Sequence, residues 1–225
     1  MKGKTDMCDD TVEVDISTPV MDKNDRFAAS NRKLFNEKKL YTLNLISSPG
    51  AGKTSVLESM ARFFGGRMAV IEGDVQTRRD ADRIEKAGCQ AWQIETGGAC
   101  HLDAQAVNHA LGHMNLSPEE LELLAIENVG NLICPSGYDL GEDMRIGLLS
   151  IPEGDDKILK YPSLFSSINV LLINKMDLIP YLNFDLDRAI EECRSLSPEV
   201  EVFTVSARTG EGMEEFCKFV ESSFS

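Results

Sequence analysis

The sequence has no apolar stretch close to the roughly 20 residues that a membrane-spanning helix needs. Its polar start, residues 1–15, also lacks the hydrophobic core of a secretory signal. Basic residues are scarce, since 23 Lys and Arg stand against 37 Asp and Glu, for a formal net charge of −14. We therefore expect a cytoplasmic protein with neither a membrane nor a nucleic acid as its partner, because nucleic-acid binding depends on clustered Lys and Arg.

Cysteines are few and widely spaced. The six of them are scattered through the chain rather than packed into the short framework of a disulfide-rich secreted domain. This spacing favours reduced thiols or metal ligands. At 225 residues and 42% hydrophobic content, the chain is long enough for one well-buried domain.

The apolar pattern divides the chain into three segments. Residues 1–20 predict a flexible tail, and residues 21–40 carry apolar side chains at the spacing of an amphipathic helix. From 41 to 225, short apolar runs alternate with helical stretches, which is typical of parallel strands joined by crossover helices. We expect strands at 43–47, 67–73, 90–95, 121–127, 145–151, 169–174 and 200–205, and helices at 54–64, 80–87, 102–114, 184–196 and 211–220. The sequence thus predicts an α/β fold with a mostly parallel sheet between two layers of helices.

A phosphate-binding loop follows the first expected strand. Gly50 and Gly52 allow the backbone to curl around phosphates at a helix N-terminus, and Lys53 supplies a cation for the outer phosphates. Thr54 offers a hydroxyl to Mg²⁺. Ser47 stands where the P-loop pattern has its first glycine. The expected phosphate-binding residues are Pro49, Gly50, Ala51, Gly52, Lys53, Thr54 and Ser55. The segment 41–225 is therefore predicted to be a P-loop nucleotide hydrolase domain.

Two later motifs favour GTP over ATP. Asn174-Lys175-Met176-Asp177 follows a strand, and its carboxylate can accept hydrogen bonds from both donors of a guanine edge. The Lys175 stem can stack on the ring. Ser206 and Ala207 follow the last strand and resemble the loop whose backbone N–H groups meet the guanine oxygen.

Two carboxylates and a glycine complete the predicted hydrolysis site. Asp74 and Glu127 each end an apolar strand, where they would hold Mg²⁺ directly or through water. Glu127-Asn-Val-Gly130 resembles the DxxG switch of GTPases, with Gly130 donating its N–H to the γ-phosphate. We expect catalysis to involve Lys53, Thr54, Asp74, Glu127 and Gly130. No water-positioning glutamine or arginine finger is evident, which predicts slow turnover.

A possible metal site lies beside this switch. Cys100 and His101 stand at the predicted start of a helix, whose dipole would lower the thiol pKa and favour the metal-binding thiolate. Cys134, just after Gly130, could add a third ligand and leave one position open for metal transfer. The alternative is that both cysteines are small buried apolar residues. Cys89, Cys193 and Cys217 are interpreted as packing residues, and His109 and His113 have no assigned role.

The combined motifs resemble the HypB family of GTPases, which help to insert nickel into [NiFe]-hydrogenases. The likeness runs from about Asn31 to the C-terminus and rests on residues 47–54, 73–74, 96–97, 100–104, 127–135, 153–156 and 174–177. It implies that Cys100, His101 and Cys134 bind nickel or zinc between two protomers that dimerise with GTP. It also implies that Lys160 approaches the partner's nucleotide, although a plain surface lysine is the alternative. The hydrogenase large-subunit precursor and other hydrogenase accessory proteins are the implied partners.

Two departures from the family pattern affect metal binding. The first forty residues contain Cys8 but no histidine, so nickel storage there is not expected, and Gln105 stands where some members have a further histidine. Three alternatives remain. The urease accessory GTPase typically carries a Cys-Pro-His motif that is absent here, a GTP-dependent interaction switch would bind no metal, and a small-molecule kinase would need no guanine motif.

Overall fold

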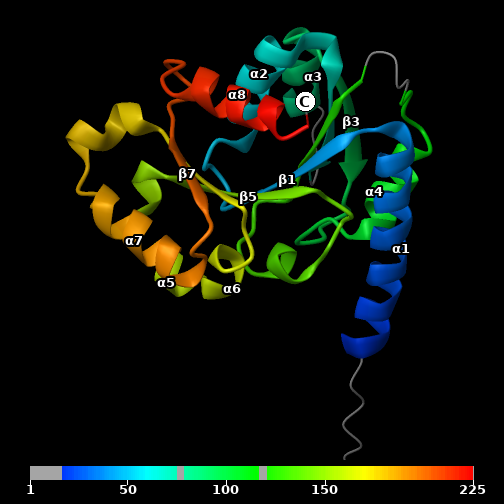
Figure 1. Cartoon of the computed structure of the whole chain (residues 1–225), viewed down its shortest axis with the longest axis horizontal. Helices are drawn as coiled ribbons and strands as arrows, with labels where there is room; N and C mark the ends of the chain where they lie inside the picture. The colour runs from blue at the N-terminus through cyan, green and yellow to red at the C-terminus, as the bar shows by residue number, and fades with distance from the viewer. Residues whose placement is uncertain (1–16, 75–78, 117–120, 225) are drawn as a thin grey trace, which may run out of the picture.

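The computed structural model describes residues 17–74, 79–116 and 121–224, except for the side chains of residues 17–19, 74 and 79. Its centre is a seven-stranded sheet in the order β3-β2-β4-β1-β5-β6-β7, in which every ladder is parallel (Figure 1). The strands are β1 Tyr41–Ser47, β2 Met68–Asp74, β3 Gln90–Glu95, β4 Leu123–Glu127, β5 Met144–Ser150, β6 Val170–Asn174 and β7 Glu201–Thr204. The predicted α/β architecture with a parallel sheet is confirmed.

Helices cover both faces of this sheet. They are α1 Ser17–Lys38, α2 Lys53–Phe64, α3 Arg79–Lys86, α4 Ala104–Leu111, α5 Lys157–Lys160, α6 Pro162–Phe165, α7 Leu186–Leu196 and α8 Met213–Ser222, with 3-10 turns η1 Gly65–Arg67, η2 Cys134–Gly137, η3 Ile151–Glu153 and η4 Met176–Tyr181. Among the described residues, no helix combines the length and the apolar character needed to cross a bilayer.

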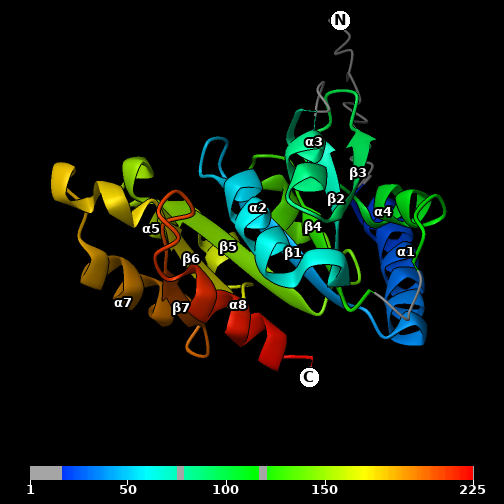
Figure 2. The same cartoon turned by 90° about the horizontal axis from the view of Figure 1, so that it is seen from above.

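Strand side chains alternate between two sets of helices, which gives the predicted three layers. Figure 2 shows α2 and α8 lying across one face of the sheet. Leu43 and Leu45 of β1 point to a core shared with α2, α3 and α8. On the other face, Ile71 of β2 packs with α1 and α4, whereas Ile173 of β6 packs with α5, α6 and α7. Because all the strands are parallel, their carboxyl ends lie on the same side of the sheet. Open parallel sheets bind ligands at these carboxyl ends.

Helix α1 starts at Ser17, four residues before the predicted start, and the rest of the predicted tail lies outside the described residues. The helix has the predicted amphipathic character, with Ala28 and Phe35 buried. Its contacts with the segment before β5 are close, since a Cβ added at Gly141 would lie 2.7 Å from the Ala28 carbonyl oxygen. Only glycine permits this approach, because its φ of 96° is also disfavoured for other residues.

Asparagine side chains on the buried face of α1 bind backbone groups of neighbouring segments. Asn31 Nδ2 donates to the carbonyl oxygens of Ala104 and Leu140, at 2.9 and 3.0 Å. The Ala104 N–H donates to Asn24 Oδ1 at 2.9 Å. The N-terminal helix therefore fixes the start of α4, directly beyond the predicted metal-binding pair.

Candidate functional site

The loop between β1 and α2 makes the tight glycine turns that a phosphate-binding loop requires. Gly50 and Gly52 adopt positive φ angles of 78° and 102°. A Cβ at Gly52 would lie 2.6 Å from Asn174 Nδ2, so this position has no room for a side chain. Asn174 Nδ2 also donates to the Ala51 carbonyl oxygen at 3.0 Å. The end of β6 thus supports the loop from behind.

Lys53 is buried at the base of this loop, with 7% of its surface exposed. Its Nζ donates to Ser47 Oγ at 3.0 Å, so the serine at the motif's first position holds the cation in place. Burial lowers the pKa of Lys53, and the nearby carboxylates of Glu127 and Glu153 oppose that shift. A polyanionic phosphate chain would add compensation for this buried charge.

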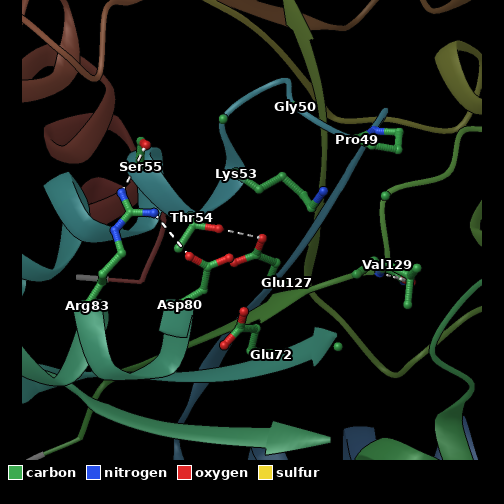
Figure 3. A pocket seen from close by; sticks show the side chains of 14 residues that line it. Pro49, Gly50, Lys53, Thr54, Ser55, Glu72, Asp80, Arg83, Glu127 and Val129 are labelled. Atoms are coloured by element: carbon green, nitrogen blue, oxygen red, sulfur yellow. Dashed lines mark hydrogen bonds and ion pairs between the residues drawn. The ribbon is translucent and has the colours of Figure 1, made fainter. Parts of the chain in front are cut away.

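Carboxylates from three elements meet beneath the loop in a cavity of about 490 Å³ (Figure 3). Glu127 ends β4, and its Oε1 accepts a hydrogen bond from Thr54 Oγ1 at 3.0 Å. Glu72 of β2 and Asp80 of α3 point toward the same space. A hydroxyl grouped with carboxylate oxygens is a donor set that suits Mg²⁺. Thr54 and Glu127 were predicted to lie at this site, whereas Glu72 and Asp80 were not.

The prediction for Asp74 is not tested, because its side chain lies outside the described residues. Its backbone ends β2, as expected. Glu72 lies two residues earlier, on the same face of the strand, and is buried with 2% exposure. Because alternate strand residues face the same side, the predicted role of Asp74 already pointed to Glu72.

Gly130 lies beside the phosphate-binding loop, as the switch motif predicted. A Cβ there would lie 3.0 Å from the backbone of Pro49, and Gly130 lines the cavity together with Val129. The end of β4 and the loop after β1 are therefore in contact where a terminal phosphate would enter.

A second cavity of about 400 Å³ adjoins the first, and its lining includes the guanine motif. Asp177 Oδ1 accepts a hydrogen bond from Ser206 Oγ at 2.7 Å, and Asn174 Oδ1 accepts one from the Ala207 N–H at 3.1 Å. The two motifs predicted to read guanine are thus in direct contact. Lys175 has a positive φ of 65°, and its Nζ donates to the Gly50 carbonyl oxygen.

Arg83 of α3 lines both cavities and was not predicted. Its guanidinium donates to Asp80 Oδ1 at 3.1 Å and to Ser55 Oγ at 3.3 Å (Figure 3). It also donates to Glu58 Oε2 at 2.8 Å. Lys160, by contrast, is exposed on α5, pairs with Asp156 and is part of neither cavity lining.

The three predicted soft ligands lie together on the surface. The ligand atoms of Cys100, His101 and Cys134 are all within 4.8 Å of one another, and Cys100 Sγ is 3.4 Å from His101 Nδ1. The His101 ring packs on Tyr138 with centroids 4.0 Å apart. Burial lowers the pKa of His101, although Asp103 opposes the shift, which favours the neutral imidazole that binds metals.

The expected helix start at Leu102 is wrong. Helix α4 begins at Ala104, and its N-cap is Asp103, whose Oδ1 accepts from the Ala106 N–H at 2.8 Å. Cys100 and His101 therefore lie in the preceding loop. The predicted lowering of the thiol pKa by the helix dipole is also wrong, since hydrogen bonding with Cys134 raises the pKa of Cys100.

Two asparagines connect the switch segment to the cysteine loop. Asn128 is buried next to Glu127, and its Oδ1 accepts hydrogen bonds from the N–H groups of Leu102 and Val129, both at 3.0 Å. Asn131 Nδ2 donates to the Cys100 carbonyl oxygen at 3.3 Å. Any displacement after β4 would therefore act on the loop that carries Cys100 and His101.

Three other cysteines and Gln105 lie away from the two cavities. Cys89, Cys193 and Cys217 are buried in the hydrophobic cores, which confirms their packing role, and burial raises their thiol pKa values to about 11, 11 and 12. Gln105 is exposed on α4, and Cys8 lies outside the described residues.

Comparison with known proteins gives consistent matches. Residues 41–204 match the family model "CobW/HypB/UreG, nucleotide-binding domain". The "Hydrogenase maturation factor HypB" of Azotobacter vinelandii is 50% identical over 210 residues, covering 92% of this chain and 68% of that protein. The "Hydrogenase/urease maturation factor HypB" of Helicobacter pylori is 43% identical over 210 residues, covering 92% and 87%. The crystal structure of HypB from Helicobacter pylori in complex with nickel superposes with a TM-score of 0.86 at 44% identity, over 90% of this chain and 95% of that one. The chain therefore belongs to the CobW/HypB/UreG family of nucleotide-binding domains and, within it, to HypB.

Proposed function

We propose that this chain is a cytoplasmic GTPase that delivers nickel during the maturation of a [NiFe]-hydrogenase, with metal binding linked to its nucleotide state. The observation that carries the proposal is the short path from Glu127 to Cys134. This one segment lines the phosphate cavity at Glu127 and Gly130, binds the Cys100 loop through Asn128 and Asn131, and ends at a thiol of the cluster.

GTP is the nucleotide that the second cavity suits. The Asp177 carboxylate can accept from both N1–H and the amino group of guanine, whereas adenine has no such donor pair. Ser206 already orients that carboxylate, and the Ala207 and Asn174 hydrogen bond holds the neighbouring loop. The match to the CobW/HypB/UreG nucleotide-binding domain and the similarity to HypB proteins support nucleotide binding at this cavity.

In the proposed reaction, the backbone of residues 49–55 surrounds the phosphates and Lys53 offsets their charge. Thr54 and Glu127, with Glu72, Asp80 and Asp74, would hold Mg²⁺, which neutralises charge that develops on the phosphate oxygens. The Gly130 N–H senses the γ-phosphate. No side chain of the chain is assigned as general base, and turnover is expected to be slow.

Metal binding follows from the donor set of Cys100, His101 and Cys134. Two thiols and one imidazole are ligands for nickel or zinc, and three ligands leave a position open for transfer. The Helicobacter pylori relative was crystallised with nickel, which supports nickel as the cargo. Since Cys100 is exposed, a second copy could share the ion, and the HypB resemblance favours a homodimer that forms with GTP.

Apolar side chains on the surface are consistent with a dimer. Ile133, next to Cys134, is 67% exposed, and Tyr181 and Leu182 are 80% and 43% exposed. Contact with a second copy of the chain would bury such side chains away from solvent. The proposed partners in delivery are the hydrogenase large-subunit precursor and other accessory proteins. Lys160 remains a proposed contact to the partner's nucleotide, and its exposure on α5 is compatible with that role.

A second candidate is delivery of nickel to urease as well. The relative from Helicobacter pylori, at 43% identity, is named a hydrogenase/urease maturation factor. Transfer of labelled nickel from the loaded protein to a hydrogenase precursor or to a urease precursor distinguishes the two.

The decisive experiment is a nickel and zinc titration of the purified protein with GDP and with a non-hydrolysable GTP analogue. We expect stoichiometric binding that depends on the nucleotide and is lost in Cys100→Ala and in Cys134→Ala. Gln105→Ala, an exposed change on α4, is the matched control and should bind like the wild type. Binding that ignores both cysteines would overturn the metal site, and binding that ignores the nucleotide would overturn the coupling.

Hydrolysis and dimerisation need separate measurements. Lys53→Ala should abolish phosphate release from GTP, and sedimentation should report a dimer with the GTP analogue and a monomer with GDP. A hydrolysis rate unchanged by Lys53→Ala would contradict the assigned phosphate site, and a monomer under both conditions would contradict the dimer.

A further inference from the structure

The two histidines that the proposed function leaves unused lie close to the cysteine cluster in sequence. The chain has three histidines in all, at positions 101, 109 and 113. His109 lies in the last turn of α4, and His113 follows one turn later. Both side chains are exposed to solvent.

The imidazole rings of His109 and His113 are already adjacent. Their centroids are 4.8 Å apart, and the rings meet edge to face at 62°. His113 lies in the turn just after α4, yet its ring remains beside that of His109. Two histidines four residues apart are a known arrangement for binding one metal ion. The two rings are therefore close enough for one nitrogen of each to reach a common ion.

Trp92 limits the motion of one member of the pair. Its ring stacks on that of His113, with centroids 5.6 Å apart and planes within 4°. Trp92 belongs to β3 and packs against the core that α1 and α4 share, so it gives the His113 ring a rigid surface. An imidazole held in this way loses less side-chain entropy when it binds an ion.

We propose that His109 and His113 form a second metal site, which binds one borderline divalent transition-metal ion such as Ni²⁺ through two imidazole nitrogens. Water molecules complete the coordination, so the ion exchanges readily with solvent. Hard ions such as Mg²⁺, which prefer oxygen ligands, are excluded. The site is separate from Cys100, His101 and Cys134 and does not rest on the function proposed for that cluster.

Trp92 also provides the measurement, since it is the only tryptophan in the chain. A paramagnetic ion on His113 would lie near enough to quench its fluorescence. The titration uses Ni²⁺ with the full-length Cys100→Ala/Cys134→Ala variant, so that the cysteine cluster contributes nothing. We expect saturable quenching with one ion per chain, and no quenching by Mg²⁺.

The histidine variants decide the outcome. On the same background, His109→Ala and His109→Gln should each weaken Ni²⁺ binding at least tenfold, while Gln105→Ala on the same helix should not. Because His113→Ala also changes the surroundings of Trp92, its loss of binding is measured by calorimetry. Quenching that is absent, that does not saturate, or that survives both His109 changes would overturn the site. Each of these results leaves the cysteine-dependent metal binding of the wild type untouched, so failure of this proposal is distinguishable from failure of the proposed function.

Discussion

Removing the Asn128 side chain should destabilise the protein far more than its small size suggests. Asn128 is 1% exposed, and it bonds to the Leu102 N–H, the Val129 N–H and Asn44 Oδ1. Asn128→Ala leaves two fully buried groups, on Leu102 and Asn44, without these partners. Each such loss costs about 1–3 kcal/mol, and the Val129 N–H adds little because it is only partly buried. We expect a loss of about 2–6 kcal/mol in the free energy of unfolding.

The assay is equilibrium unfolding in urea, followed by circular dichroism without nucleotide and analysed by linear extrapolation. Asn131→Ala is the matched control, because its bond to the Cys100 carbonyl oxygen is long, at 3.3 Å, and exposed. That variant should lose less than about 1 kcal/mol. If Asn128→Ala cost less than about 1 kcal/mol, or no more than the control, Asn128 would not hold the cysteine loop as described.

Three further predictions concern guanine recognition, the reactivity of the cysteine thiols and an ion pair of the first helix. Asp177→Asn should weaken GTP binding by about 10- to 100-fold and improve the binding of xanthosine triphosphate, whose ring offers an acceptor in place of the amino group; unchanged affinities in a competition assay would argue against guanine recognition. Alkylation followed by mass spectrometry at pH 7.5 should modify Cys100 and Cys134 at least ~100-fold faster than Cys89, Cys193 and Cys217. Burial shields these three thiols from the reagent and raises their pKa values to about 11, 11 and 12; equal rates would contradict their burial. Burial raises the pKa of Asp139, but hydrogen bonds from Arg32 and Gly141 outweigh it and keep the pKa below 3.8. A depressed pKa stabilises the fold above the unfolded value and loses that effect as pH falls through the folded value. Asp139→Asn should therefore cost about 1 kcal/mol at pH 7. That cost should shrink as pH falls below 3.8 and vanish once the folded carboxyl is protonated; a cost that stays the same from neutral to acid pH would exclude an ionic contribution.

The strands were predictable because they are short apolar runs, fully buried in the central β4 and β6 and partly buried in the edge strands β3 and β7. Their observed bounds lie within two residues of those expected. Helix α4 was misplaced because the apolar Leu102 continues the helical pattern, although it packs from a loop against the end of β2. There, a Cβ at Gly73 would lie 2.7 Å from its side chain. Asp103 could have corrected the predicted helix start, because Asp is a preferred N-cap residue and its side chain caps the Ala106 N–H. Helices α5 and α6 are only four residues each, too short for a periodic pattern.

In the candidate site, residues of local sequence motifs were predictable, and residues brought together only by the fold were not. The P-loop and the guanine motif were legible because their chemistry is local, with each residue type required at a fixed spacing. Asp80 and Arg83 were not predicted because nothing near them in sequence indicates a ligand, and for Glu72 the only indication was its spacing of two residues from Asp74. These side chains reach the cavity through the pairing of β2 with β4 and the packing of α3. Likewise, the contact of Cys134 with Cys100 joins two loops over thirty residues apart, and no local pattern encodes it.

The strand order has a consequence for how the chain folds during synthesis. β1 emerges early, yet both of its neighbours, β4 and β5, begin nearly 80 and nearly 100 residues after β1 ends. At roughly 5–20 residues per second, the ribosome needs about 4–15 s to supply even the first of them. During that interval the apolar residues of β1 have no sheet partner. The residues proposed to bind guanine arrive later still, from the end of β6 onward and after β7. On that proposal, GTP would stabilise only a nearly complete domain and would not guide its early folding.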